Sequence, residues 1–314
     1  MNKQINQLSV EDFAVFLGTS CDQISDSIKN LITQSQFQYQ ALQGSEREQV
    51  ILQVLKDIDL KDFAKVGIPE RQKTWEMAWS DHLNEFATKG FAQEELDPKF
   101  MRSNEIVRLK KNYVKPLVPN FELNYAKVCK TWLFEKYLME VDSVYEFGCG
   151  SGFNLVMLAK LYPHKKIYGL DWAYSSVNLV NINAQKHGFN ITGRQFNFLE
   201  PDEQLELENN SAFLTVAALE QVGKNHDKFI NFILSKSPTL VINLEPIAEY
   251  YDSDNLVDYL ALMYHKKRGY LDGYLAKLKE LELNNKIKII KAEPSDFGSL
   301  YHSPYSMLVW IPLS

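Results

Sequence analysis

The chain has 314 residues, of which 45% are hydrophobic and 24% are charged, and its formal net charge is −6. This composition is typical of a globular protein with one or two domains and a full apolar core. The sequence has no apolar run of about 18 residues, which excludes a membrane span, and its acidity disfavours a nucleic-acid-binding protein. The start of the chain lacks the apolar run of a signal peptide and the three cysteines lack disulfide spacing, so we expect a cytoplasmic location.

Residues 1–122 are predicted to form a helical N-terminal domain that includes a lid. Ser9 and Asp12 have the spacing of a capping box at a helix start. Trp75 and Trp79 follow at helical spacing, and we interpret them as core residues rather than as a surface on which a substrate stacks.

The most basic part of the chain is residues 97–120, which has little periodicity. It is either a solvated linker or the lid over a binding cleft. As a lid it would bring Arg102 or Arg108 to an anionic substrate, because the arginine fork donates two hydrogen bonds at once to a carboxylate or phosphate.

The remaining residues, 123–314, alternate between predicted strands and helices. A helix is expected over 123–138, and strands are expected at 143–147, 166–171, 193–197, 212–217, 239–244, 286–292 and 306–311. This order indicates an α/β fold with an open, doubly wound and mostly parallel sheet. A helical insertion over about 255–283 interrupts it after the fifth strand.

Three glycines follow the first of these strands in the pattern E-x-G-x-G-x-G, from Glu146 to Gly152. Glycine is required where the backbone takes a positive φ or where a ligand approaches closely. Asp171 ends the next strand about 20 residues later, the separation at which an acid meets the ribose hydroxyls of a nucleotide. Phe153 breaks the dinucleotide pattern G-x-G-x-x-G/A, which makes a dehydrogenase the weakest alternative.

This stretch resembles motif I of the class I S-adenosylmethionine-dependent methyltransferases. The resemblance implies S-adenosyl-L-methionine as cofactor, with its amino-acid end wrapped by the glycine loop and its ammonium bonded to Glu146. It also implies an antiparallel last strand, and hence a Rossmann-like sheet of seven strands. The cofactor contacts expected on this basis are Glu146, Gly148, Cys149, Gly150, Gly152, Asp171, Trp172, Asn197, Phe198 and Glu220.

The methyl acceptor is expected outside the carboxyl ends of the strands, where open α/β sheets bind their ligands. A hydroxyl acceptor must lose a proton, and the candidate catalytic groups are His265, His302 and Glu220. A single histidine is more often structural, so these histidines are also candidates for core positions. The candidate substrate contacts are Arg102, Arg108, Glu245, Tyr264 and Arg268. Glu245 has a second interpretation, as a surface carboxylate that caps a helix.

The predicted function is methyl transfer to a small-molecule acceptor, at a hydroxyl oxygen. Residues 298–310 resemble tails of methyltransferases that act on sugars and surface polysaccharides, which implies a precursor of that class. Ala218-Leu219-Glu220-Gln221 stands where many amino-nitrogen methyltransferases carry Asn/Asp-Pro-Pro-Tyr/Phe, which disfavours methylation of DNA bases or glutamine. We see no metal-ligand spacing.

Two alternatives remain open on the sequence. One is a methyltransferase that acts on protein or RNA, with residues 97–120 as its docking strip. The other is a protein that binds S-adenosylmethionine without turnover.

Overall fold

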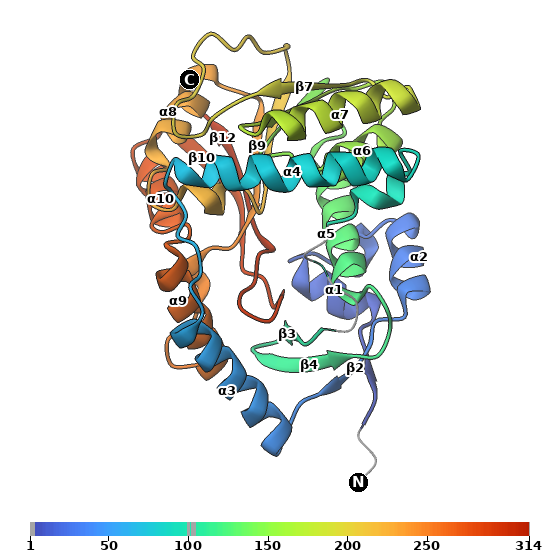
Figure 1. Ribbon diagram of the computed structural model, residues 1–314, viewed down its shortest axis with the longest axis vertical. Coiled ribbons are helices and arrows are strands. Elements are labelled where there is room, and N and C mark those ends of the chain that lie inside the picture. Colours follow the sequence, from blue (N-terminus) through green and yellow to red (C-terminus); the bar gives the residue numbers. More distant parts are fainter. Residues whose placement is uncertain (1–3, 99–100, 102–104, 314) are drawn as a thin grey trace.

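The structure is a computed structural model and describes residues 4–98, 101 and 105–313, so Arg102 lies outside the described residues. Two sheets organise the chain (Figure 1). The larger one has seven strands in the order β10-β12-β9-β8-β5-β6-β7. Its members are β5 (Ser143–Phe147), β6 (Lys166–Asp171), β7 (Ile191–Gln195), β8 (Ser211–Val216), β9 (Leu240–Glu245), β10 (Ile287–Glu293) and β12 (Ser306–Pro312).

The pairing confirms the predicted sheet. β5 runs parallel to β6 and β8, and β9 runs parallel to β8. Only the last strand is reversed, since β12 is antiparallel to both β9 and β10. The fold is therefore the expected doubly wound, mostly parallel α/β sheet with an antiparallel last strand.

Helices cover both faces of this sheet, which is why the interior strand β5 is buried along its whole length. On one face, Val144 of β5 belongs to a core cluster shared with α5 (Phe121–Tyr137), α6 (Phe153–Leu161) and α7 (Tyr174–His187). On the other face, Tyr145 and Phe147 pack with α8 (Asp227–Lys236) and α10 (Tyr274–Leu283). Alternation along β5 thus sends neighbouring side chains into two separate cores.

The first two strands have the predicted bounds, the other five differ from theirs by one or two residues, and the third strand shows why. It ends at Gln195, because the side chain of Asn197 accepts the amide of Leu199 at 3.0 Å and turns the chain away from the sheet. The predicted insertion is also present, as α9 (Leu256–Arg268) and α10.

The N-terminal segment is helical, as predicted, over α1 (Val10–Phe16), α2 (Asp26–Ser35), α3 (Gly44–Leu60) and α4 (Glu70–Thr88). The expected capping box of Ser9 and Asp12 is formed at the start of α1. The same segment also supplies four short strands that the sequence did not predict: β1 (Asn6–Gln7), β2 (Gln38–Ala41), β3 (Val107–Leu109) and β4 (Asn112–Pro116).

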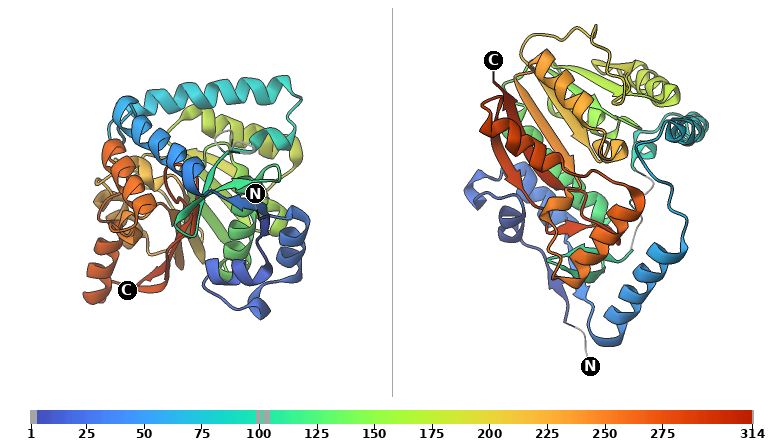
Figure 2. Two further views of the ribbon diagram at one scale, coloured as in Figure 1. Left: turned by 90° about the horizontal axis from the view of Figure 1, so that it is seen from below. Right: turned by 90° about the vertical axis from the view of Figure 1, so that its left-hand side faces the viewer.

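These strands form the second sheet, in the order β1-β2-β4-β3-β11, and its last member comes from the other end of the chain. β11 (Phe297–Gly298) pairs with β3, and Phe297 stacks on Tyr125 of α5 with ring centroids 3.8 Å apart. The N-terminal segment and the core therefore share one sheet, which Figure 2 shows below the large one in its right-hand view.

The lid predicted over residues 97–120 is not confirmed for the part that the structure describes. Residues 107–116 form the β3–β4 hairpin of the small sheet. It is α4 that crosses the carboxyl-end side of the large sheet (Figures 1 and 2), where its Glu76 accepts hydrogen bonds from the amide and hydroxyl of Ser175 at the start of α7.

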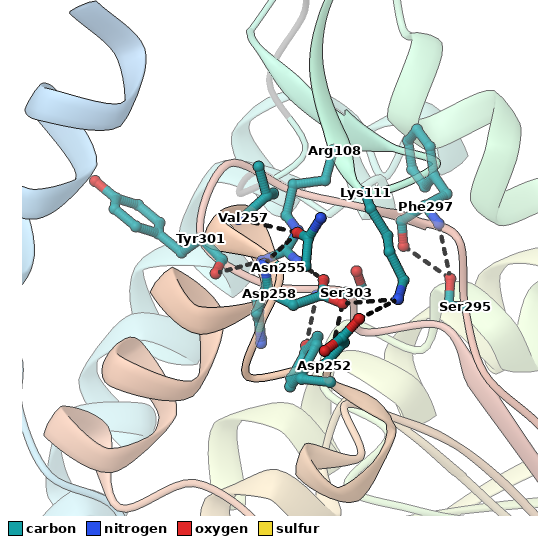
Figure 3. A network of polar contacts seen from close by, with 12 residues as sticks. Arg108, Lys111, Asp252, Asn255, Val257, Asp258, Ser295, Phe297, Tyr301 and Ser303 are labelled. Carbon is teal, nitrogen blue, oxygen red and sulfur yellow. Dashed lines mark hydrogen bonds and ion pairs between the residues drawn. The ribbon is translucent and has the colours of Figure 1, made fainter. Parts of the chain in front are cut away.

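Arg108 fastens the small sheet to the insertion (Figure 3). Its guanidinium is buried and donates to Asp258 of α9 at 2.6 Å and to the carbonyl of Tyr301 at 3.3 Å. It also lies over the ring of Tyr251, 5.4 Å from its centroid. Because this ion pair already neutralises its charge, Arg108 has a structural role in place of the predicted contact with an anionic substrate.

We predict that Arg108→Ala destabilises the protein by about 3–5 kcal/mol, because it leaves the Asp258 carboxylate buried without its partner. Lys110→Ala is the control, since Lys110 pairs with Asp12 at 2.7 Å on a partly exposed surface and such pairs contribute about 0–1 kcal/mol. Urea unfolding of the two variants measures the difference, and equal midpoints would contradict the assigned role.

Candidate functional site

The glycine loop after β5 is the centre of the site. Gly148, Gly150 and Gly152 have φ values of +74°, +52° and +77°, a region that other residues rarely adopt. Space also requires glycine at two of these positions. A Cβ on Gly148 would lie 2.4 Å from the Cβ of Ala218, and a Cβ on Gly150 would lie 2.7 Å from the Trp79 ring.

Asp171 holds this loop in place from the carboxyl end of β6. One carboxylate oxygen accepts the amide of Gly150 at 3.0 Å and the other accepts the amide of Ala173 at 2.9 Å. Burial raises the pKa of Asp171 to about 6, although both amide bonds oppose that shift. Two neighbouring strand ends are thus joined by one carboxylate.

A cleft of about 540 Å³, including its open mouth, lies above the loop. Its floor is the glycine loop, and its walls come from β6, from the segment after β7 and from the segment after β8. The lining residues are Trp75, Trp79, Gly148, Gly150, Asp171, Trp172, Phe198, Ala217, Ala218, Gln221 and Val222. Trp172 and Phe198 therefore lie where the sequence predicted a cofactor.

The roof of the cleft is α4. Trp75 and Trp79 stack on each other with centroids 5.8 Å apart, and both line the cleft, so their interpretation as core residues was wrong. The Trp75 indole donates to the Gln221 side chain at 3.4 Å, and Gln72 donates to the carbonyl of Trp172 at 3.1 Å. Helical spacing showed that the two tryptophans share a face, but only the docking of α4 shows what that face covers.

Two predicted cofactor contacts point elsewhere. The thiol of Cys149 is buried 3.8 Å from the Ser176 hydroxyl, within the apolar core rather than in the cleft. The side chain of Asn197 is used in the turn with Leu199, and its neighbour Phe198 reaches the cleft instead. Side chains alternate along an extended chain, so a shift of one residue exchanges the two directions.

Glu146 lies beneath the glycine loop and is fully buried. The amide of Asn154 donates to one of its carboxylate oxygens, and the other oxygen has no hydrogen-bond partner among the described residues. Burial raises the pKa of Glu146, while Asn154 and the buried Lys130 oppose the shift. One buried carboxylate oxygen of Glu146 therefore has no hydrogen-bond donor next to the loop, among the described residues.

Glu245 proves to be a buried cap rather than a surface carboxylate or a cleft residue. Its oxygens accept the amides of Ala218, Leu219 and Glu220 at 3.1, 3.0 and 3.3 Å. They hold the short 3-10 helix η3 (Leu219–Val222) at the end of β8. This corrects the predicted substrate contact, since the hydrogen-bonding capacity of Glu245 is directed at the backbone.

Glu220 is presented by η3 directly beside the cleft residue Gln221, whose amide donates to it at 2.9 Å. Its second oxygen has no partner among the described residues. Burial, followed by the charge of Glu245, raises the pKa of Glu220 to about 8. At neutral pH this carboxyl is therefore mainly protonated.

His265 and His302 lie together behind Glu220. Their nitrogens Nε2 and Nδ1 are 3.2 Å apart, and Nδ1 of His265 has no partner among the described residues. Burial, followed by the charge of Arg108, lowers the pKa of His265 to about 3, and burial likewise lowers that of His302. Both imidazoles are neutral at physiological pH.

Tyr270 connects this histidine pair to Glu220. Its ring centroid is 5.4 Å from that of His265 and 5.5 Å from that of His302, and its hydroxyl lies near enough to Glu220 to lower the pKa of that carboxyl. The predicted contacts Tyr264 and Arg268 belong to the same group, with Tyr264 5.6 Å from Tyr270. The structure thus brings together the three proposed catalytic side chains, although they come from η3, α9 and the tail.

One member of this cluster was not singled out in the sequence. Arg71, in the first turn of α4, is buried, and its guanidinium lies 5.4 Å from the Trp75 ring. Its position depends on how α4 docks, so no local pattern marks it.

None of the helices in the described part of the chain is long and apolar enough to cross a membrane. No group of three or more His, Cys, Asp and Glu side chains in those same residues is arranged to hold a metal ion.

We predict that Glu220→Gln makes the stability of the protein less dependent on pH. Because the folded pKa of Glu220 is raised from 4.5 to about 8, its contribution is complete below about pH 4.5 and is lost as the pH rises through about 8. The variant should therefore gain on the order of 2–4 kcal/mol over the wild type at pH 9 and little at pH 5. Thermal melts across this range, with the exposed Glu200→Gln as control, test it, and parallel profiles would contradict it.

Comparison with known proteins agrees with this geometry. Residues 140–236, which hold the glycine loop, Asp171 and η3, match a family described as a methyltransferase domain. A release factor glutamine methyltransferase of Geobacter sulfurreducens is 32% identical over 81 residues, or 25% of this chain and 28% of that enzyme. The chain thus matches well under two thirds of that relative's length.

Two similar solved structures are an O-methyltransferase of neocarzinostatin biosynthesis and a geranyl diphosphate C-methyltransferase of Streptomyces coelicolor. The first is 14% identical, covers 62% of this chain and 58% of its own, and has a TM-score of 0.40. The second is 9% identical, covers 62% and 81%, and has a TM-score of 0.46. Residues 140–236, which carry the glycine motif on the parallel sheet, are thus similar to a methyltransferase domain.

Proposed function

We propose that the whole chain is an S-adenosylmethionine-dependent methyltransferase that methylates a hydroxyl oxygen of a small molecule, a sugar or surface-polysaccharide precursor. The proposal rests on the position of the cleft next to the polar cluster around Glu220. A glycine-floored cleft lies beside a buried cluster of polar groups that lack partners, and Gln221 and Glu220 are the adjacent residues that join them.

The cleft fits the cofactor on several counts. Gly148 and Gly150 leave the floor free of side chains, and Asp171 lines it with a carboxylate for the ribose hydroxyls. Trp172 and Phe198 provide aromatic walls for a base. The unpartnered oxygen of Glu146 is an acceptor of the kind that an ammonium group requires. When bound, the cofactor supplies a methyl group on a positively charged sulfur.

The polar cluster fits an acceptor that has to lose a proton. Glu220 is the member nearest to the cleft, and its free oxygen is a proton acceptor once the carboxyl is ionised. The neutral pair of His265 and His302 lies behind Tyr270 and can position or relay that proton. We therefore place Glu220 first among the candidate bases.

The alternative of an RNA or protein substrate docked on residues 97–120 finds less support. Arg108 is neutralised by Asp258, and Lys110 and Lys111 pair with Asp12 and Asp252. A polyanion-binding strip needs cations that are available to phosphates. A steep fall of activity with salt concentration would favour that alternative.

We predict that the protein binds S-adenosylhomocysteine with micromolar affinity, roughly −8 kcal/mol by calorimetry. Asp171→Asn should weaken binding about ten- to a hundredfold, because it removes charge-assisted hydrogen bonds to the ribose. Asp142→Asn, at an exposed position, is the matched control. Tight binding of NADH without any response to S-adenosylhomocysteine would contradict the proposal, and turnover in a panel of acceptors separates an enzyme from a non-catalytic binding protein.

We predict that Glu220→Gln lowers kcat by about 10²–10⁴ and leaves cofactor affinity unchanged, because the amide cannot take the acceptor proton. In the wild type kcat/KM should rise towards pH 8, since burial raises the pKa of Glu220 to about 8 and only the ionised carboxylate accepts a proton. Steady-state kinetics on a hydroxyl acceptor measure both effects. A greater loss in His265→Ala or His302→Ala than in Glu220→Gln would transfer the role of base to the histidine pair.

A further inference from the structure

Two arginines lie near Glu220, beside the cleft. Arg71 lies in the first turn of α4 and is only 9% exposed, with its guanidinium 5.4 Å from the centroid of the Trp75 ring. Arg268 ends α9 and donates to the Tyr270 hydroxyl at 3.1 Å, with its guanidinium 4.9 Å from the centroid of that ring. Each guanidinium therefore lies on an aromatic ring, and the Nε–H group of each has no hydrogen-bond partner among the described residues.

The backbone brings these two side chains together. In the segment that leads into α4, the amide of Val66 donates to the carbonyl of Arg268 at 2.9 Å, and the amide of Gly67 donates to the carbonyl of Gln221 at 2.8 Å. The start of α4 is thus tied both to the end of α9 and to η3. The two guanidinium groups also repel each other. The pKa of Arg71 is lowered first by burial and next by the charge of Arg268.

Positive charge in this place is not balanced by the protein. Within the described residues neither arginine has an ion-pair partner, and the Nε atoms of both lack a hydrogen bond. The carboxyl that acts on both is Glu220, which is mainly protonated at neutral pH because its pKa is raised to about 8. A buried, unpaired charge is costly unless a partner or ligand supplies the opposite sign.

We propose that Arg71 and Arg268 bind one anionic group of the methyl acceptor, a carboxylate or a phosphate. The inference rests on the proposed function, which places the acceptor beside Glu220 and the cleft. Arginine suits this task because its planar fork gives two parallel hydrogen bonds to either anion. This pair takes the role that the sequence suggested for Arg108, and it selects acidic sugars or sugar phosphates over neutral sugars.

The test uses the full chain saturated with S-adenosylhomocysteine at constant ionic strength. Inorganic phosphate, glucuronate and neutral glucose are titrated separately, and tryptophan fluorescence reports binding because Arg71 lies on Trp75. We expect phosphate or glucuronate to bind and glucose not to bind, and the stronger of the two anions identifies the preferred group. Arg71→Gln and Arg268→Gln should each weaken that binding at least about tenfold. Lys73→Gln, which removes an exposed charge from the same helix, should not.

A second measurement needs no ligand. If Arg71 is an unbalanced buried charge, Arg71→Gln should melt at a higher temperature than the wild type in the absence of ligands. If it is instead paired with ionised Glu220, the variant should melt lower, and the proposal is overturned. Unchanged anion affinity in both arginine variants, equal binding of glucose and glucuronate, or no response to either anion would overturn it as well. Failure of the wild type to bind S-adenosylhomocysteine contradicts the proposed function instead, and the melting temperature of Arg71→Gln still decides on the anion site.

Discussion

The site depends on buried carboxylates at the carboxyl ends of the strands that accept backbone amides. Asp171 bonds the amides of Gly150 and Ala173, and Glu245 bonds three successive amides at the start of η3. A loop in a buried place must satisfy its amides, and here side chains do so where no neighbouring strand can. These two residues set the path of the glycine loop and of the segment that carries Glu220. The cleft between them follows from that.

A second buried polar network supports the same region from below. Asn243 of β9 donates to the Thr215 hydroxyl of β8 at 3.0 Å and accepts from Tyr274 at 3.0 Å and from Trp310 at 2.9 Å. It therefore connects the insertion and the last strand to the centre of the sheet. In a low-dielectric interior such fully satisfied networks specify one arrangement, because each alternative leaves a polar group unpaired.

The N-terminal segment completes the site rather than standing apart from it. α4 places an indole over Gly150 and a guanidinium beside Glu220, and the hairpin of β3 and β4 binds the insertion through Arg108 and Asp258. Because the small sheet includes β11, strands from the N-terminal segment and from the C-terminal part of the chain pair in one sheet. The cofactor cleft and the polar cluster thus share α4 as one wall.

The sequence by itself determined the parts of this protein that are local. Alternating strands and helices identified the doubly wound sheet correctly, and the glycine pattern located the turn that follows β5, because backbone conformation and strand order depend on residues that are neighbours in the sequence. The tertiary structure alone decided which distant side chains meet. It paired Arg108 with Asp258, turned Glu245 to backbone amides, laid Trp75 and Trp79 over the cleft and set Arg71 beside Arg268. Those contacts depend on how whole helices pack against the rest of the protein. Because packing and the burial of charge set the helix directions, no local sequence pattern predicts these contacts.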